Sequence, residues 1–223
     1  MLIRIPSVLG SKELRLVQDI LANASFVEGT LSAGKVARRV KHNQEISPDS
    51  DQLQQLNNLV MGGLVRHPDY QAAALPHRIA SPFYARYAEG MEYGPHIDDP
   101  VMGEDNRYRS DIAITIFLTN PDTYVGGELI ISTSMGEQYI KYPAGDAVMY
   151  PASTRHRVAR VIKGWRLVAV TWVQSLVRDP AKRELLFQLH QAREKLLKDA
   201  PDEKETQLVD IAYVNLVRMW ADL

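Results

Sequence analysis

Cysteine is absent from this chain. Its absence excludes disulfide bonds and every zinc or iron–sulfur site held by thiolates, so a bound metal would need histidine and carboxylate ligands. Long apolar runs are also missing, since none approaches the roughly 20 residues that a membrane-spanning helix needs. The N-terminal segment MLIRIPSVLGSKELR reaches charged residues after a brief apolar start and lacks the small-residue cleavage site of a secretory signal. We therefore expect a cytoplasmic protein with no membrane partner.

A surplus of charge of either sign is missing as well. Lysine and arginine number 26, aspartate and glutamate 27, and the formal net charge is -1. Nucleic acids and anionic membranes attract proteins through a surplus of basic residues, so we expect neither as a partner. With 223 residues, 45% of them hydrophobic, the chain can bury one sizeable core and carry a small additional unit.

Two segments near the N-terminus, residues 11–23 and 48–66, have apolar residues at the spacing of an amphipathic helix. The apolar positions are Leu14, Val17, Ile20 and Leu21 in the first segment and Leu53, Leu56, Leu59, Val60 and Leu64 in the second. Pro48 suits the first turn of the second helix, because its missing N–H would be unpaired there in any case. The pair Gly62-Gly63 is expected to weaken the end of that helix.

From about residue 78 onward the apolar residues follow a period of two, which is typical of β-strands. The clearest example is DIAITIFLT at 111–119. Further short strands are expected at 128–133, 138–142, 146–150, 157–162 and 166–173, with turn residues such as Gly126-Gly127 and Pro143-Ala144-Gly145 between them. The last of these strands is apolar on both faces, as in a strand that is covered from both sides. Short strands at this spacing predict an antiparallel barrel or sandwich.

The helical period returns after Asp179-Pro180. Residues 180–198 and 202–221 each carry an apolar stripe. The stripes consist of Leu185, Leu186, Leu189, Ala192 and Leu196, and of Leu208, Ile211, Ala212, Leu216 and Trp220. We expect a C-terminal helical hairpin that packs on the β-core or on a second copy of the protein, in which case these helices would form a homodimer.

The stretch GMEYGPHIDDP at 90–100 contains His96 and Asp98. In an extended segment, residues i and i+2 point to the same side, so this imidazole and this carboxylate can reach one metal ion. The pattern alone is a weak signal, because His67-Pro68-Asp69 is a second copy with no β-strand predicted close by. We interpret His67 as a solvated loop residue.

The surroundings of His96 and Asp98 make a metal site more specific. A β-run turns at Pro151 and delivers His156 to the start of the next strand. Two imidazoles and one carboxylate are the ligand set of non-haem Fe(II) oxygenases and leave positions open for a co-substrate and dioxygen. Arg166, on that next strand, could bind the far carboxylate of a dicarboxylic 2-oxo acid in bidentate fashion, while the near end chelates the metal. Tyr87 could add a hydroxyl to the same carboxylate.

The assembly as a whole carries a family resemblance. The order Tyr87…Gly90…Tyr93…His96-x-Asp98…GGEL…His156-x9-Arg166 resembles the Fe(II)/2-oxoglutarate dioxygenases of the prolyl/lysyl hydroxylase type. More narrowly, nearly the whole chain, including its helical tail, resembles the bacterial PKHD-type hydroxylases, a family linked with iron uptake.

The resemblance implies a mostly β fold with flanking helices, whose core is a double-stranded β-helix (jelly roll). It implies a helical region at 1–77, a dioxygenase domain at 78–177 and a helical extension at 178–223. Fe(II) would be held by His96, Asp98 and His156, and 2-oxoglutarate by Arg166 and Tyr87, with L-ascorbate as an additional reductant. The expected reaction is the hydroxylation of an unactivated C–H bond of an amino-acid, peptidyl or siderophore-related substrate, with release of succinate and CO2.

Two other functions remain open at this point. A cupin-like metalloprotein would commonly carry a His-x-His pair with a further histidine and a glutamate, a set that this chain does not show. A non-catalytic sensor that binds the metal and a 2-oxo acid would have no need of all four polar groups. Formation of succinate from 2-oxoglutarate would separate the dioxygenase from both.

Other polar residues are interpreted as structural or solvated, namely His42, His77 and His190. Tyr93 is expected to serve in packing. Arg107 and Arg109 lie in the segment 99–110, which is expected either to close over a substrate as a lid or to be an ordinary charged loop.

Overall fold

The computed structural model describes residues 1–29, 39–47, 50–103 and 105–222. The helices of this part are α1 (Ser11–Ala22), α2 (Leu53–Arg66), α3 (Pro68–Ala74), α4 (Pro180–Asp199) and α5 (Lys204–Trp220), with a 3-10 helix, η3 (Pro121–Thr123). The first strands are β1 (Ile3–Ile5), β2 (Phe26–Glu28), β3 (Lys41–His42), β4 (Gln44–Ile46), β5 (Pro76–Ile79), β6 (Phe83–Tyr87), β7 (Glu92–His96), β8 (Val101–Met102) and β9 (Tyr108–Arg109). They are followed by β10 (Ile112–Phe117), β11 (Val125–Gly126), β12 (Leu129–Thr133), β13 (Gly136–Ile140), β14 (Ala147–Pro151), β15 (His156–Val158), β16 (Val161–Lys163) and β17 (Arg166–Ser175).

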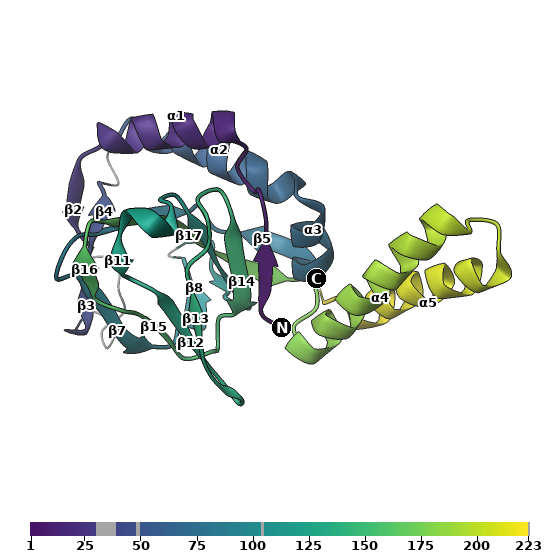
Figure 1. The fold of residues 1–223 in the computed structure, drawn as a ribbon. Coiled ribbons are helices and arrows are strands. Elements are labelled where there is room, and N and C mark those ends of the chain that lie inside the picture. Colours follow the sequence, from purple (N-terminus) through teal and green to yellow (C-terminus); the bar gives the residue numbers. More distant parts are fainter. Residues whose placement is uncertain (30–38, 48–49, 104, 223) are drawn as a thin grey trace.

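Two antiparallel sheets form the body of the molecule (Figure 1). The larger sheet has the strand order β1-β14-β10-β17-β6-β4-β2, with β5 paired to the far end of β17. The smaller sheet has the order β13-β12-β15-β7-β3. Strands that are distant in sequence are neighbours in both sheets, as β15 and β7 are. The predicted mostly β architecture with flanking helices is therefore observed.

The period of two in the central strands divides the core into two layers. On β10, Ile112, Ile114 and Ile116 belong to a core cluster between the larger sheet and the helices. Ala113 and Phe117 point the other way, into a second cluster between the two sheets. All six residues of β10 are buried, because helices cover one face of the larger sheet and the smaller sheet covers the other.

Helices α1 and α2 lie side by side over the outer face of the larger sheet (Figure 1). The second helix begins at Leu53, later than expected, and Pro48 lies outside the described residues. The helix continues through Gly62-Gly63 to its predicted end at Arg66. A Cβ on Gly63 would lie 2.2 Å from the carbonyl oxygen of Val8, so glycine allows the N-terminal segment to pack directly on the helix.

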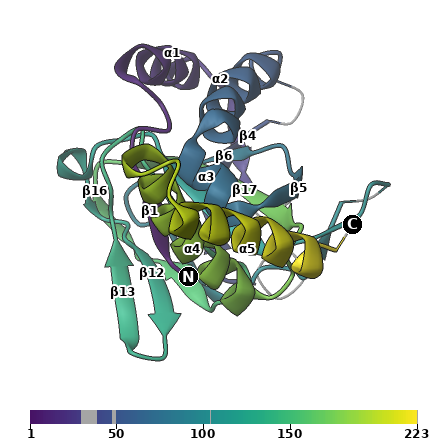
Figure 2. The same cartoon turned by 90° about the vertical axis from the view of Figure 1, so that its right-hand side faces the viewer.

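Two strand predictions need correction. The run 157–162 is not one strand, because it divides into β15 and β16, which pair with different partners. Residues 141 and 142 of the predicted strand 138–142 lie beyond the end of β13, which begins at Gly136. Strands β12 and β13 form a hairpin that extends from the body (Figure 2), with Met135 92% exposed at its tip.

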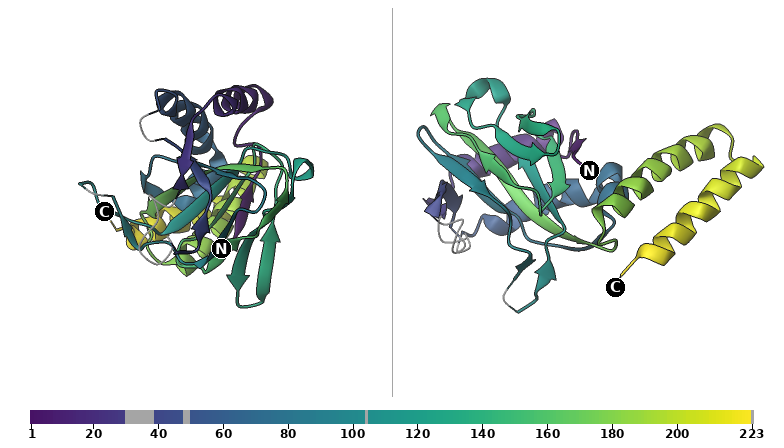
Figure 3. Two further views of the ribbon diagram at one scale, coloured as in Figure 1. Left: turned by 90° about the vertical axis from the view of Figure 1, so that its left-hand side faces the viewer. Right: turned by 90° about the horizontal axis from the view of Figure 1, so that it is seen from below.

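The C-terminal pair of helices is observed as predicted, but it projects from the body (Figures 1 and 3). Helix α4 packs against α3 near its start and against α5 along its length, and Leu186 and Phe187 are its buried apolar residues. Leu208 and Ile211 on α5 are each 56% exposed. Most of the apolar stripes are therefore not covered by the β-core. None of the helices in the described part is long and apolar enough to cross a membrane.

Candidate active site

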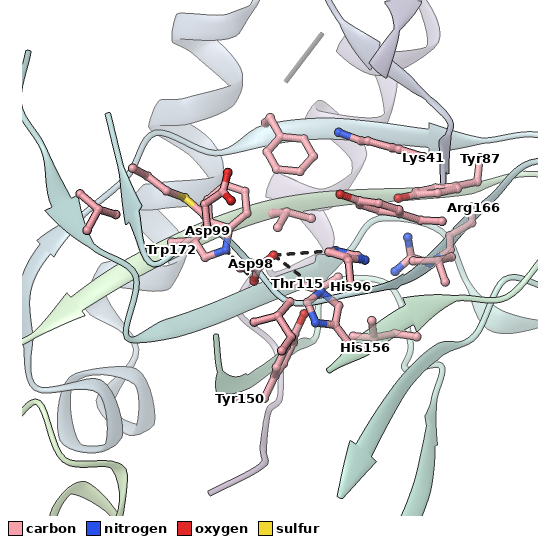
Figure 4. A pocket seen from close by; sticks show the side chains of 18 of the residues that line it. Lys41, Tyr87, His96, Asp98, Asp99, Thr115, Tyr150, His156, Arg166 and Trp172 are labelled. Carbon is pink, nitrogen blue, oxygen red and sulfur yellow. Dashed lines mark hydrogen bonds and ion pairs between the residues drawn. The ribbon is translucent and has the colours of Figure 1, made fainter. Parts of the chain in front are cut away.

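A cavity of about 410 Å³ lies between the two sheets (Figure 4). Its walls come from the inner faces of β6, β10 and β17 in the larger sheet, from β7 and β15 in the smaller sheet, and from the segment 97–103. The predicted site residues His96, Asp98, His156, Arg166 and Tyr87 all line it. These five residues, which are spread along the sequence from Tyr87 to Arg166, therefore line one cavity.

His96, Asp98 and His156 form a group whose ligand atoms all lie within 4.8 Å of one another. The two histidines are directly opposite each other in the register of β7 and β15, which brings their side chains together. Asp98 follows two residues after β7 ends, and its Oδ1 lies 3.8 Å from Nε2 of each histidine. These distances are longer than a hydrogen bond. A metal ion placed between the three atoms could bind each of them at about 2.1 Å.

Both histidines are held by their own backbone. Nδ1 of His96 contacts the carbonyl oxygen of Gly94 at 2.9 Å, and Nδ1 of His156 contacts that of Thr154 at 3.0 Å. A carbonyl oxygen can only accept, so each Nδ1 carries a hydrogen and each Nε2, the atom with a lone pair in the neutral imidazole, faces Asp98. Burial, with a smaller effect of the neighbouring His156, lowers the pKa of His96 to about 4. The neutral imidazole, the form that binds metal, is thereby favoured.

Trp172 fixes the orientation of Asp98. Its indole Nε1–H donates a hydrogen bond of 2.9 Å to Oδ2, which leaves Oδ1 to face the histidines. Burial raises the pKa of the Asp98 carboxyl, with His156 and the bond from Trp172 acting against the rise. A bound cation would favour the ionised carboxylate in the same way. The sequence analysis did not single out Trp172, although the period of two places it on the same face of β17 as Arg166.

Arg166 is a buried cation, only 2% exposed. It lies directly opposite Tyr87 in the register of β17 and β6, with its guanidinium carbon 5.1 Å from the centre of the Tyr87 ring. Burial raises the pKa of Tyr87 to about 12, so its hydroxyl stays protonated and can donate. None of the acidic residues in the described ranges forms an ion pair with Arg166, and its Nε has no hydrogen-bond partner there.

Tyr124 is a further buried group beside Arg166 that the sequence analysis missed. Its hydroxyl is buried beside the Arg166 side chain. Burial raises the Tyr124 pKa, and the charge of Arg166 opposes part of the rise. An unpaired guanidinium nitrogen together with protonated hydroxyls suits a carboxylate, which accepts from all of them. These groups therefore fit the far end of 2-oxoglutarate.

Gly127 allows this arrangement. Its backbone is in the left-handed region, with φ +68°, and a Cβ there would lie 3.1 Å from the Tyr124 ring and 3.4 Å from Cδ of Arg166. The glycine pair of the GGEL sequence thus lets the turn before β12 approach both side chains closely.

Lys41 also lines the cavity, and no sequence pattern pointed to it. It is buried and forms an ion pair with Glu45, and its ammonium group lies 5.2 Å from the ring centre of Phe83 and 5.5 Å from that of Tyr93. Tyr93 in turn stacks on His96, with ring centres 3.7 Å apart. It packs on the His96 ring, as expected, but it also faces the cavity.

The second His-x-Asp sequence, His67-Pro68-Asp69, does not line the cavity. His67 caps the start of α3, where Nδ1 accepts from the N–H of Asp69, and its Nε2 contacts the carbonyl oxygen of Pro6 at 2.9 Å. The interpretation of His67 as a solvated loop residue was therefore wrong. Arg109 forms an ion pair with Asp111 and does not line the cavity.

The segment 99–110 borders the cavity. It forms the two-stranded ribbon β8–β9, and Asp99, Val101, Met102 and Gly103 belong to the cavity wall. The carbonyl group of Arg107 accepts a hydrogen bond from Arg78. The segment is thus placed beside the opening, where a lid would lie, and closure over a substrate stays a prediction.

Comparison with known proteins agrees with this geometry. Residues 82–174 match the model of the 2OG-Fe(II) oxygenase superfamily, and residues 180–222 match that of the PKHD-type hydroxylase C-terminal domain. A PKHD-type hydroxylase of Thioalkalivibrio sulfidiphilus is 50% identical over the full length of both chains. Another, from Synechococcus elongatus, is 42% identical, again over the full length of both.

Solved structures resemble the fold at low sequence identity. A prolyl-4-hydroxylase of Pseudomonas putida has a TM-score of 0.53 and 16% identity, covering 78% of this chain and 92% of its own. A prolyl hydroxylase of Trichoplax adhaerens, solved with a peptide of the hypoxia inducible factor, has a TM-score of 0.56 and 18% identity, covering 82% of this chain and 86% of its own. The expected jelly-roll core is confirmed by these similarities.

Proposed function

This chain belongs to the PKHD-type hydroxylases, and its residues 82–174 match the 2OG-Fe(II) oxygenase superfamily; on that premise we propose that it hydroxylates an unactivated C–H bond with Fe(II), 2-oxoglutarate and dioxygen. We assign Fe(II) to His96, Asp98 and His156 and the far carboxylate of 2-oxoglutarate to Arg166 and Tyr87. We add Tyr124 to the binding residues of this carboxylate.

One observation supports the proposal most directly. A metal-ligand group of two imidazoles and one carboxylate shares a cavity with a buried guanidinium that forms no ion pair with the described residues and whose Nε has no hydrogen-bond partner among them. Three protein ligands leave coordination positions open for a bidentate 2-oxo acid and for dioxygen. The arginine gives that acid one orientation, because its far carboxylate must reach the fork of donors.

The overall reaction converts R–H, 2-oxoglutarate and O2 into R–OH, succinate and CO2. One oxygen atom enters the substrate C–H bond and the other enters the new carboxylate of succinate. When bound, the iron supplies the redox chemistry that activates dioxygen. The chain itself holds the ligands in place through backbone carbonyls and Trp172, orients the co-substrate through Arg166, and places both in a cavity between two sheets.

The remaining functional assignments are proposals of the same kind. We propose a small-molecule or peptidyl substrate, a role connected with iron uptake, L-ascorbate as an additional reductant, and activity in the cytoplasm, where 2-oxoglutarate is made. Nucleic acid is not proposed as a partner, because the net charge is -1. We also keep the division of the chain into 1–77, 78–177 and 178–223.

Self-association through α4 and α5 is a further part of the proposal. Leu185, Leu208 and Ile211 are each 56% exposed on this projecting pair of helices. A second copy of the chain presents the same residues, so a two-fold axis would bury both sets against each other. We propose a homodimer on this basis.

Succinate formation tests the proposed reaction. With Fe(II), 2-oxoglutarate and dioxygen, the purified protein is expected to release succinate even without a prime substrate, although slowly. Under anaerobic conditions, addition of Fe(II) and 2-oxoglutarate is expected to give the visible charge-transfer absorption of the chelate. His96→Ala and Asp98→Ala should abolish both signals, because each removes one of only three protein ligands.

His77→Ala is the matched control, since His77 is an exposed histidine of β5 that does not line the cavity. Succinate release and the charge-transfer absorption of this variant should equal those of the unchanged protein. Circular dichroism should show that all variants are folded. Iron-dependent succinate formation that persists in Asp98→Ala would contradict the ligand assignment. Binding of 2-oxoglutarate without any succinate in the unchanged protein would favour a non-catalytic sensor.

A further inference from the structure

The cavity has a second end that the metal and co-substrate do not use. In Figure 4, Arg166 and Tyr87 lie at one end and Trp172 and Asp99 at the other, with the metal-ligand group between them. The wall at this second end is apolar and aromatic. Phe83 stacks on Trp172 with ring centres 5.5 Å apart, and Ile97, Val101 and Met102 add aliphatic surface.

Among the described residues of the cavity wall, some charged side chains have an oppositely charged partner and one does not. Lys41 is paired with Glu45. Arg166 and Asp98 serve the co-substrate and the metal in the proposed function. The Asp99 side chain is exposed and forms no ion pair or hydrogen bond with any residue in the described ranges.

Binding of the metal and of 2-oxoglutarate leaves the charge of Asp99 uncompensated. A divalent metal with two neutral imidazoles and Asp98 keeps one positive charge, and Arg166 adds a second. The two carboxylates of 2-oxoglutarate cancel both. The carboxylate of Asp99 is then the one uncompensated charge among the described lining residues, and it lies at the solvent-exposed rim of the cavity.

Asp99 is also well placed relative to the reacting centre. It directly follows the ligand Asp98 in the chain, so the two Cα atoms are about 3.8 Å apart. The Ser110 hydroxyl donates to the carbonyl oxygen of Asp99, and the Ser110 N–H donates to that of Pro100 at 3.1 Å. These bonds tie the segment to the residues just before β10, so the carboxylate is carried by an anchored backbone.

We infer that the prime substrate carries a cationic group, an ammonium or a guanidinium, that pairs with Asp99, while an aliphatic stem beside it lies along the wall of Phe83 and Trp172. This inference rests on the proposed function and names its substrate class. Side chains such as those of lysine and arginine combine an apolar stem with a charged head in this way. The carbon presented to the metal is a methylene of the stem, because the charged head is held at Asp99.

Four small probes test the inference: the N-acetyl amides of L-lysine, L-arginine, L-norleucine and L-glutamate. Binding is measured anaerobically with Fe(II) and 2-oxoglutarate present, from the change in the charge-transfer band and in tryptophan fluorescence. We expect the lysine and arginine probes to bind about tenfold more tightly than the norleucine probe, and the glutamate probe to bind most weakly. The cationic probes should also raise the rate of succinate release.

Asp99→Asn should remove the preference for cationic probes, so that the lysine, arginine and norleucine probes bind with similar affinity. Asp122→Asn, which changes an exposed carboxylate in η3, should retain the preference. Equal binding of the lysine and norleucine probes, no binding of either cationic probe at millimolar concentration, or an unchanged preference in Asp99→Asn overturns the inference. Loss of the charge-transfer band in the unchanged protein would instead contradict the proposed function itself.

Discussion

At the scale of single residues, the bond from Trp172 to Asp98 determines how the carboxylate is presented. The indole N–H occupies Oδ2, so the oxygen that faces His96 and His156 is Oδ1. A carboxylate held in this way binds through one oxygen and leaves room for other ligands. Partners that orient a metal ligand typically change metal affinity by 10- to 100-fold when they are removed, by the general behaviour of outer-shell groups.

Trp172→Phe is therefore expected to weaken Fe(II) binding by about tenfold. Phenylalanine keeps an aromatic ring against Phe83 but has no N–H to donate. An anaerobic Fe(II) titration, followed by the charge-transfer band at saturating 2-oxoglutarate, gives the dissociation constant. Trp165→Phe is the control, since Trp165 is 54% exposed and does not line the cavity. An Fe(II) affinity equal to that of the unchanged protein would remove the positioning role.

The sequence predicted site residues best where the spacing between two residues determines which side of a strand they occupy. His96 and Asp98 share a side of an extended segment, and His156 and Arg166 follow on two successive predicted strands. Tyr124 could not be found in this way, because its approach to Arg166 depends on the turn at Gly126-Gly127. Lys41 and Glu45 meet within a buried region whose pairing no local pattern predicts.

At the scale of elements, β17 organises the whole cavity. Its inner face carries Arg166, Val168, Val170 and Trp172 in alternating positions, so one strand contributes the proposed co-substrate anchor, apolar wall and the partner of Asp98. A register shift of one residue would turn all four to the other face of the sheet. Pairing with β10 on one side and β6 on the other fixes that register.

Gly127, in the turn before β12, lies close to Arg166 of β17. Gly127→Ala adds a methyl group that would contact Tyr124 and Arg166 and also Cγ2 of Val161, at 3.0 Å. We expect the concentration of 2-oxoglutarate that gives half-maximal succinate release to rise about tenfold, a loss of about 1.4 kcal/mol of binding free energy. Fe(II) affinity should change little, because the ligands belong to other segments.

Gly90→Ala controls for the strain of the backbone. Gly90 has φ +83°, and a Cβ there would meet no atom within 4 Å. Both substitutions should lower the free energy of unfolding by about 1 kcal/mol, but only Gly127→Ala should change the 2-oxoglutarate requirement. Equal effects of the two on that requirement would mean that strain, and not contact with the binding residues, is responsible.

Element boundaries were harder to predict than element types. The apolar pattern identified α2 and its buried face, but not its start at Leu53. The run 157–162 was apolar enough to suggest one strand, yet β15 pairs with β12 and β7 whereas β16 pairs with β11. Such breaks arise from pairing with distant strands, which a single sequence does not reveal.

At the scale of the whole molecule, the chain consists of a β-body with a projecting helical pair. Sequence periodicity predicted the two helices of that pair but not how much of their apolar surface the body would cover, because coverage depends on how α4 packs on α3. The exposed leucine and isoleucine positions on α5 are the basis for the proposed homodimer.

A double substitution, Leu208→Glu with Ile211→Glu, is expected to convert the dimer into a monomer, because opposed like charges would replace apolar contacts at the two-fold axis. Light scattering after size-exclusion chromatography measures the mass. Met135→Glu is the control, since Met135 is exposed at the tip of the β12–β13 hairpin, far along the chain from α5. If the unchanged protein has the mass of one chain at micromolar concentration, this part of the proposal is wrong.

The charge of the buried Arg166 side chain has a consequence beyond catalysis. Arg166 forms no ion pair with any residue of the described ranges, and a buried cation of this kind disfavours the folded state, so a dianion that enters beside it relieves this penalty. A ligand that binds only the native chain raises the free energy of unfolding as its concentration rises. The thermal stability of the folded chain should thus rise with the concentration of 2-oxoglutarate, and a chain kept without it should unfold more readily.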